Sequence, residues 1–188
     1  MPARYGGRVD PARRGDSFDT ARLRVRPLAS GDLDVIVRIH TDPALMRHIH
    51  RGVPHTPDEC VVDLARALAH WRDHRCGSFV VTTRAGQLVG TVGFTTPEWL
   101  PEVMPARDVG WTIVQEHQGH GYATEAARAA IDWYFASFRD DRVVGIHNSD
   151  NPRSGAVMQR LGMRWSRRTR HPMLGYPLEI WETTRAER

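Results

Sequence analysis

Lysine is absent from this sequence of 188 residues, and all 26 of its basic residues are arginine. Mechanisms that depend on a lysine amine, such as a Schiff base or a lysine in a phosphate loop, are therefore excluded. Cysteine is scarce as well: Cys60 and Cys76 are too few for a disulfide framework and are not spaced as metal ligands. We expect both to be reduced thiols.

Long apolar runs are also missing. No segment approaches the roughly 18 apolar residues of a membrane-spanning helix, and the N-terminal residues lack the apolar core of a secretory signal. We therefore expect a cytoplasmic protein with no membrane partner. The net charge of +4 slightly favours anionic partners. The arginines are scattered, however, and show no nucleic-acid-binding motif, so we expect no nucleic-acid partner.

The composition divides the chain into a short tail and one domain. Residues 1–19 are rich in Gly, Pro and Arg and have no apolar period, which predicts a disordered N-terminal tail. Residues 20–188 contain no internal repeat, so we expect a single domain there. With 40% hydrophobic and 26% charged residues, the chain has the composition of a globular protein.

Strands and helices alternate along the domain. Ser30 is expected to cap the first helix, Asp42 the second, and Thr56 the third, where Glu59 completes a capping box. The expected strands are residues 22–26, 79–83, 88–94, 108–114, 143–146, 163–167 and 176–184, and the later helices are residues 121–138 and 151–162. Residues 84–87 predict a hairpin turn. The fold class expected is α/β (α+β), with a mixed, mainly antiparallel central sheet flanked by helices.

A turn with two glycines separates the strand at 108–114 from the long helix. Its last residues are Gln118-Gly119-His120-Gly121-Tyr122-Ala123-Thr124. Glycines allow a tight turn with N–H groups pointing outward, and the start of a helix adds unpaired N–H groups and the positive end of its dipole. Such a turn can cradle a phosphate or a pyrophosphate. Glycine spacing alone leaves a plain turn equally open.

Two motifs in this chain resemble those of the GNAT acetyltransferases. The run from Gln118 to Ala123 resembles the pyrophosphate loop of that family, written Q/R-x-x-G-x-G/A. The second motif is similar at Asn148, Asn151, Ser154, Val157 and Leu161-Gly162-Met163. Residues 20–27 and 180–185 further resemble the Rim-type ribosomal-protein alanine N-acetyltransferases. The resemblance covers about residues 20 to 185; it is specific for the superfamily and weak for the acceptor.

The resemblance implies acetyl-CoA as co-substrate and no metal. The backbone of Ile113 and Val114 would bond the pantetheine arm, and one N–H there would polarise the thioester carbonyl. The pyrophosphate would be held by the N–H groups of Gln118, Gly119, His120, Gly121, Tyr122 and Ala123, with the Thr124 hydroxyl assisting. Asn151 would bond the pantetheine chain, or would serve only as a helix cap.

The resemblance also suggests how protons move. Many GNAT enzymes protonate the leaving thiolate with a tyrosine of the second motif, but Met158 stands at that position. The Rim-type subgroup implies Ser154 as the acid instead; its alternative is an ordinary residue of a first helical turn. Asp108 is the candidate base, with a surface strand residue as the alternative. Further base candidates are Glu98, Glu102 and Glu179.

Three functions stay open at this point. The subgroup suggests transfer of an acetyl group, by direct attack of a primary amine, to a protein N-terminus such as an alanine. The alternatives are a small-amine acetyltransferase, acting on an amino acid, polyamine or antibiotic, and a non-catalytic acyl-CoA-binding module. Monomer and homodimer are both compatible with the sequence.

Two clusters of charged or titratable residues complete the inventory. The four neighbouring histidines, His40, His48, His50 and His55, lie on no helix face at ligand spacing, so no metal site is expected. A late arginine run is either a solvated face or an attraction for an acidic acceptor or the 3′-phosphate of CoA; it comprises Arg160, Arg164, Arg167, Arg168 and Arg170.

Overall fold

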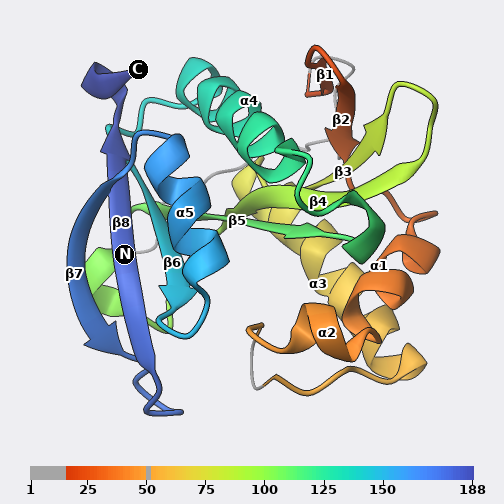
Figure 1. The fold of residues 1–188 in the computed structure, drawn as a ribbon, viewed down its shortest axis with the longest axis horizontal. Helices are drawn as coiled ribbons and strands as arrows, with labels where there is room; N and C mark the ends of the chain where they lie inside the picture. Colours follow the sequence, from red (N-terminus) through yellow and green to blue (C-terminus); the bar gives the residue numbers. More distant parts are fainter. Residues whose placement is uncertain (1–15, 50–51) are drawn as a thin grey trace.

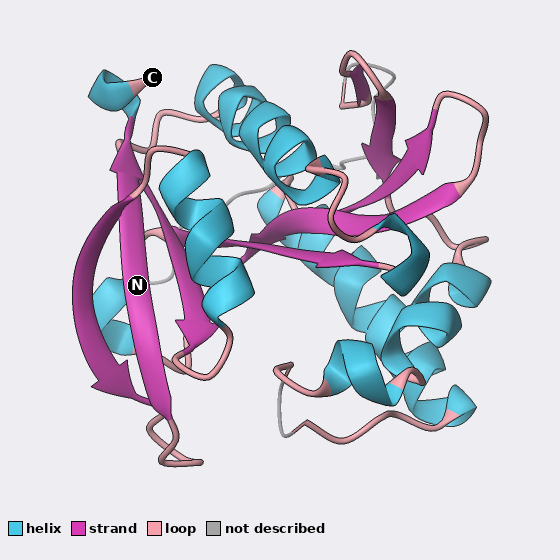
Figure 2. Cartoon of the chain, viewed as in Figure 1, coloured by secondary structure: helices cyan, strands magenta, loops and turns pink. Residues whose placement is uncertain are grey.

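The computed structural model describes residues 16–49 and 52–188, which form one sheet flanked by helices (Figures 1 and 2). The strands are β1 (Phe18–Asp19), β2 (Leu23–Pro27), β3 (Ser78–Thr83), β4 (Leu88–Thr95), β5 (Arg107–Ile113), β6 (Arg142–Asn148), β7 (Arg164–Arg170) and β8 (Pro177–Thr184). The α-helices are α1 (Leu33–His40), α2 (Pro43–Met46), α3 (Pro57–His74), α4 (Tyr122–Ser137) and α5 (Pro152–Arg160).

The sheet has eight strands in the order β1-β2-β3-β4-β5-β6-β8-β7. Every neighbouring pair is antiparallel except β5 and β6, which run parallel and are connected through α4. A parallel pair needs such a crossover, whereas antiparallel neighbours can be joined by short turns. The mixed, mainly antiparallel sheet expected from the sequence is therefore confirmed.

Helices cover both faces of the sheet (Figure 1). The alternation of β3 shows how: Phe79 and Val81 join the core beneath α4 and α5, while Val80 joins the core beneath α1 and α3. Helix α4 contributes a stripe of small and large apolar residues to the first core, including Ala130, Ile131 and Tyr134. The 3.6-residue period of this helix thus places it on the sheet as expected.

The helix starts agree with the sequence at two of three places. Asp42 Oδ1 accepts a hydrogen bond from the Ala44 N–H at 2.8 Å, and Thr56 and Glu59 form the full capping box of α3. Ser30 does not cap α1, so that prediction is wrong. The helix begins after Asp32, whose buried carboxylate instead accepts bonds from the Ala29 N–H and from the Arg26 guanidinium.

The expected tail reaches too far into the domain. Phe18 and Asp19 form β1, which pairs with β2, and the Phe18 ring packs on Phe79 and Trp133. The prediction of disorder for residues 1–15 lies outside the described residues. Strands β6 and β7 also end later than the predicted strands at residues 143–146 and 163–167.

The two cysteines are buried and form no disulfide, as expected. Burial raises the pKa of the Cys76 thiol to about 11, which keeps it protonated at neutral pH. None of the helices in the described ranges has both the length and the hydropathy needed to cross a lipid bilayer.

Replacing Phe18 tests whether β1 belongs to the folded domain. Phe18→Ala removes an aromatic ring from contact with Phe79 and Trp133. We expect the free energy of unfolding to fall by about 1–3 kcal/mol, measured by urea denaturation. The exposed neighbour Ser17→Ala is the matched control and should change it by less than about 0.5 kcal/mol. Equal stability of both variants would show that Phe18 does not contribute to the folded domain.

Candidate active site

Strands β5 and β6 part soon after they meet (Figure 1). Their pairing is limited to Arg107 with Val143 and Asp108 with Val144. Beyond that point the Ile146 N–H of β6 donates to the Asp108 Oδ1 at 3.0 Å. A side-chain carboxyl thus takes the place of the strand backbone, which ends the ladder and leaves a gap between the two strands.

The electrostatics of Asp108 differ from those of a surface strand residue. Burial raises the pKa of its carboxyl to about 8, and the bond from the Ile146 N–H lowers it only in part. A group with a pKa near neutrality can exchange a proton under physiological conditions. Asp108 is half-buried and bonded to β6, which favours its prediction as a base over the surface-residue alternative.

Of Ile113 and Val114, the two residues expected to bond the co-substrate, only Ile113 directs its backbone toward the gap. The Val114 N–H donates to the Val89 carbonyl of β4, and the Val114 carbonyl accepts from the His117 N–H, both at 3.0 Å. Since successive residues of an antiparallel strand point alternately toward and away from the partner, the backbone of Ile113 points away from β4. The Val114 N–H is therefore bonded within the sheet, and a cofactor contact from the backbone of Val114 stays a prediction.

The glycine turn adopts the conformation that only glycine takes easily. Gly119 and Gly121 have φ of 80° and 78°, in the left-handed region. Gly121 is the N-cap of α4, and the first bond within the helix runs from the Glu125 N–H to the Gly121 carbonyl at 3.1 Å. The N–H groups of Tyr122, Ala123 and Thr124 precede that bond and so have no acceptor within the helix, which creates an anion-binding helix start.

Gln118 braces this turn rather than contributing an open N–H. Its N–H donates to the Gln115 carbonyl at 3.2 Å, and binding of pyrophosphate by this N–H stays a prediction. The side-chain Nε2 donates to the Ile113 carbonyl at 2.9 Å, and Oε1 accepts from Arg153 of α5 at 3.1 Å. Gln118 therefore connects the end of β5, the turn and α5.

A second group of contacts comes from the segment between β1 and β2 and was not found from the sequence. Arg22 forms an ion pair with Glu125 of α4 at 2.6 Å and donates to the His120 carbonyl at 2.9 Å. Thr20 adds a hydrogen bond to the same carboxylate at 2.5 Å. Burial raises the pKa of Glu125, but the bonds from Thr20 and Arg22 outweigh it and hold the pKa below its usual range. The carboxylate therefore stays ionised and fixes the start of α4 to that segment.

Helix α5 begins beside the same gap. Asn151 Oδ1 accepts from the Ser154 N–H at 3.3 Å, which establishes the capping role that the sequence had left open. Ser154 is half-buried in the first turn. Met158 is buried, and its side chain fills the space beside Gly145 where a Cβ would otherwise point. Met158 is therefore part of the core.

A histidine beneath α5 was also missed. The Trp181 Nε1–H donates to His147 Nε2 at 3.2 Å, and an indole nitrogen can only donate. His147 Nδ1 lies 2.8 Å from the Asn148 carbonyl, which can only accept, so Nδ1 carries the proton. A Cβ at Gly155 would lie 3.3 Å from Nε2. A glycine here lets α5 approach β6 closely.

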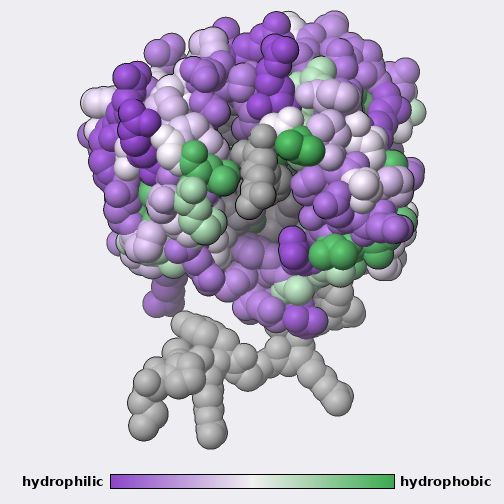
Figure 3. All heavy atoms as spheres, turned by 90° about the horizontal axis from the view of Figure 1, so that it is seen from below, coloured by the Kyte–Doolittle hydropathy of each residue, from purple (hydrophilic) through white to green (hydrophobic). Residues whose placement is uncertain are grey.

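An open groove of about 660 Å³ passes over the exposed face of α4, beside Gly121 and Thr124. Three arginines line it, Arg22, Arg128 and Arg160, together with Asp19, Glu125 and Asp132. The face seen in Figure 3 is largely hydrophilic, with hydrophobic side chains only in small separate groups.

A family model described as "Acetyltransferase (GNAT) domain" matches residues 22–164. The chain belongs to the GNAT acetyltransferase family. Among curated relatives, YkkB of Bacillus subtilis is 30% identical over 53% of this chain and 55% of its own length, so the match spans about half of that relative. YnaD, an N-acetyltransferase of the same organism with no characterised substrate, is 26% identical over 77% of this chain and 81% of its own length.

Solved structures share the fold at low identity. RimL, a ribosomal α-N-protein acetyltransferase solved with coenzyme A, has a TM-score of 0.75 and 12% identity, covering 90% of this chain and 97% of RimL. Spermidine N-acetyltransferase from Vibrio cholerae, solved with CoA and spermine, has a TM-score of 0.74 and 18% identity, covering 89% and 98%. Membership of this family supports N-acetyltransferase activity in general and specifies no acceptor.

The other base candidates of this GNAT domain differ from Asp108. The Trp165 indole, together with Arg168 and Ser149, donates to Glu179 and holds the pKa of that carboxyl below its usual range. Glu102 forms an ion pair with Arg167, and Glu98 is exposed. A lowered pKa makes Glu179 a poor base, so Asp108 is the strongest candidate.

The arginine run separates into two groups. Arg164, Arg167 and Arg168 form ion pairs with carboxylates of the same domain, and the Arg170 guanidinium bonds the Gly175 carbonyl. Arg160 alone among the five lines the groove over α4. The four neighbouring histidines also separate: His40 and His55 meet on Asp63, His48 is in no such group, and His50 lies outside the described residues.

The raised pKa of Asp108 predicts how stability depends on pH. Because its native pKa of about 8 lies above the ~3.9 of an unfolded aspartate, stability is lost as pH rises between these values. Asp108→Asn keeps an oxygen for the Ile146 N–H and cannot ionise. We expect the Tm of the variant relative to wild type to increase from about pH 5 to about pH 8.

Thermal unfolding followed by circular dichroism across this pH range measures the effect. Asp150→Asn, which removes an exposed carboxylate, is the control and should shift Tm equally at all pH values. Parallel Tm curves for wild type and Asp108→Asn would show that Asp108 has an ordinary pKa.

Proposed function

We propose that this protein binds acetyl-CoA across the start of α4 and into the gap between β5 and β6, and there acetylates a primary amine by direct attack. The observation that carries the proposal is the juxtaposition of a donor-rich helix start with two parted strands. The turn that connects them is held by Gln118 on one side and Arg22 on the other.

The donors of the turn suit the pyrophosphate. The backbone N–H groups of Gly119, His120 and Gly121 precede those of Tyr122, Ala123 and Thr124, and the helix dipole adds positive potential. The Thr124 hydroxyl lies in the adjoining groove, where Arg128 and Arg160 offer charge to the 3′-phosphate. The outward-facing backbone of Ile113 and the side-chain amide of Asn151 would bond the pantetheine arm.

Different residues around the gap accept and donate the protons that the reaction moves. Acetyl-CoA supplies the activated acyl group. Asp108, when deprotonated, accepts the proton that the attacking amine loses. The Ile113 N–H holds the thioester oxygen while negative charge develops on it. Ser154 donates its hydroxyl proton to the leaving sulfur and regains a proton from solvent, to which Asp108 releases the proton taken from the amine. Cys60 and Cys76 are buried, which supports direct attack without an acetyl-cysteine.

The acceptor proposed first is a protein N-terminal amine, in particular alanine, within a Rim-type subgroup. Residues 20–27 and 180–185 support this assignment, together with the shared fold of RimL. A small amine is the second candidate, supported by the shared fold of a spermidine acetyltransferase. Cytoplasmic location belongs to the same proposal. A non-catalytic acyl-CoA-binding module would bind the co-substrate without turnover.

Calorimetric titration with acetyl-CoA, followed by an assay of thiol release, tests the proposal. One-to-one binding and release of CoA with an Ala-initiated peptide would support the N-terminal acceptor. Faster release with spermidine or an amino acid would favour the small-amine alternative. Binding without release for any amine would leave the non-catalytic module, and no binding at millimolar acetyl-CoA would refute the proposal.

Gly121→Val tests the pyrophosphate turn. A valine strains the left-handed backbone at φ 78° and turns the N–H groups at the start of α4 away from a ligand. We expect acetyl-CoA affinity to fall at least about 100-fold by calorimetry, as removal of several charge-assisted bonds implies. Gly86→Val is the matched control, since Gly86 has φ 87° in the β3–β4 hairpin and open space around it. Equal losses in both would attribute the effect to backbone strain.

Ser154→Ala tests the proposed acid. We expect kcat to fall about 100-fold, the usual contribution of a general acid, while acetyl-CoA affinity changes less than about twofold. Ser154→Cys, which keeps an ionisable proton, should recover part of the loss. Steady-state kinetics and calorimetry measure the two effects. Wild-type kcat in Ser154→Ala would leave Ser154 as an ordinary residue of the first turn of α5.

A further inference from the structure

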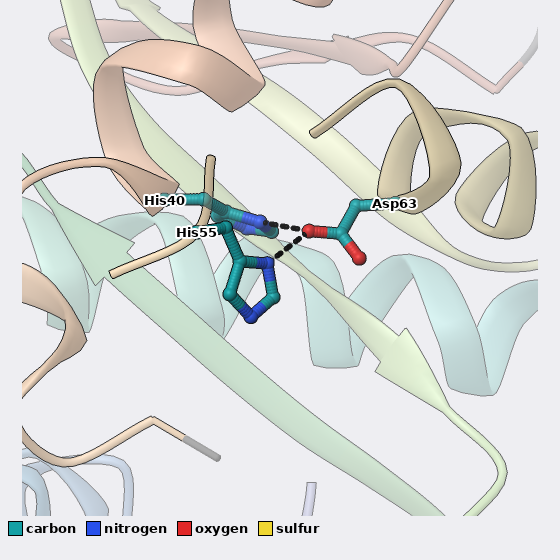
Figure 4. A group of neighbouring side chains, drawn as sticks. All are labelled: His40, His55 and Asp63. Carbon is teal, nitrogen blue, oxygen red and sulfur yellow. Dashed lines mark hydrogen bonds and ion pairs between the residues drawn. The ribbon is translucent and has the colours of Figure 1, made fainter. Parts of the chain in front are cut away.

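Two histidines and one aspartate converge on a point outside the proposed acetyl-transfer site (Figure 4). His40 is the last residue of α1, His55 precedes α3, and Asp63 lies in the second turn of α3. The Nδ1 atoms of His40 and His55 lie 2.7 and 2.6 Å from the same atom, Asp63 Oδ2. The three potential ligand atoms all lie within 4.8 Å of one another.

The backbone around this cluster holds its members in place. The His55 N–H donates to the His40 carbonyl at 2.8 Å, which fixes the two histidines side by side. Helix α1 ends on a bond from the Thr41 N–H to the Val37 carbonyl at 3.0 Å. The capping box of Thr56 and Glu59 fixes the start of α3, one turn before Asp63. Three separate segments therefore present their side chains from anchored positions.

The donor set and its spacing suit a divalent transition-metal ion. Zinc binds imidazole nitrogen and carboxylate oxygen at about 2.0–2.2 Å, so tetrahedral ligand atoms lie roughly 3.3–3.5 Å apart. The nitrogen–oxygen distances would have to open by less than about 1 Å, which rotation of the side chains supplies. The exposed fractions of the His40, His55 and Asp63 side chains are 21, 22 and 15%. A fourth position can therefore hold a water molecule.

We propose that His40 Nδ1, His55 Nδ1 and Asp63 Oδ2 form a binding site for one Zn²⁺-like divalent cation, completed by water. The cation replaces the proton on each Nδ1 atom. A neutral imidazole then carries its proton on Nε2, and an imidazolium releases its Nδ1 proton to solvent. A bound ion joins the end of α1 and the segment before α3 to α3 itself. The site shares no residue with the proposed acetyl-CoA site, so the two proposals can fail separately.

The experiment uses the full chain without a histidine tag, dialysed against a chelator and then titrated with Zn²⁺. We expect one-to-one binding by calorimetry and a rise in Tm on adding Zn²⁺. His40→Gln, His55→Gln and Asp63→Asn should each weaken binding at least about 10-fold and remove the Tm rise. His48→Gln and His74→Gln are the controls and should bind as wild type; His74 belongs to another histidine pair, with His70, whose ring centroids lie 4.4 Å apart.

Cobalt absorption is a second measurement, made on the wild type and therefore independent of how the variants fold. A four-coordinate Co²⁺ gives intense visible bands, and a six-coordinate ion gives weak ones. Intense bands that Zn²⁺ displaces support the site. Weak bands, unchanged affinity in the three cluster variants, or no binding at micromolar Zn²⁺ would overturn it and leave a hydrogen-bonded cluster.

Discussion

The bond between the Asp108 carboxyl and the Ile146 N–H decides the shape of this domain at its centre. A parallel ladder between β5 and β6 would otherwise continue, since both strands extend well beyond their two paired positions. By bonding the backbone N–H of Ile146, the side chain satisfies a partly buried donor of β6 where the strands part. The same burial raises the pKa of Asp108 to about 8, so the group that opens the gap also acquires the means to move a proton within it.

An open gap is useful only if the turn at its end is rigid, and two side chains make it so. Gln118 ties the turn to β5 and α5, and Arg22 ties it to the carboxylate of Glu125. The Glu125 side chain is 18% exposed but that of Arg22 is 49% exposed, so solvent screens this ion pair in part. Because side chains from flanking elements hold the turn, the backbone N–H groups of α4 remain available for an anion.

Local patterns predicted much of this structure, and long-range contacts account for most of the errors. The helix caps at Asp42 and Thr56 and the period of α4 are local properties, and each is confirmed. The Ser30 cap was wrong because α1 begins after Asp32, which the Arg26 side chain of β2 holds in place. Spacing along the chain could not show that His40 and His55 meet, since a carboxylate on α3 brings them together.

The two sides of the proposed acetyl-transfer site are held with unequal strength. At the segment between β1 and β2, Glu125 accepts a part-buried bond from Thr20 and an exposed one from Arg22. On the α1–α2 side, Asp42 accepts from Gln115 at 2.9 Å and Arg38 pairs with Glu116, but these groups are exposed. Exposed pairs contribute about 0–1 kcal/mol, so they constrain α1 and α2 weakly. The turn before α4, where the co-substrate is proposed to bind, is thus held by side chains of the domain itself. The position of α1 and α2 depends instead on how they pack against α3.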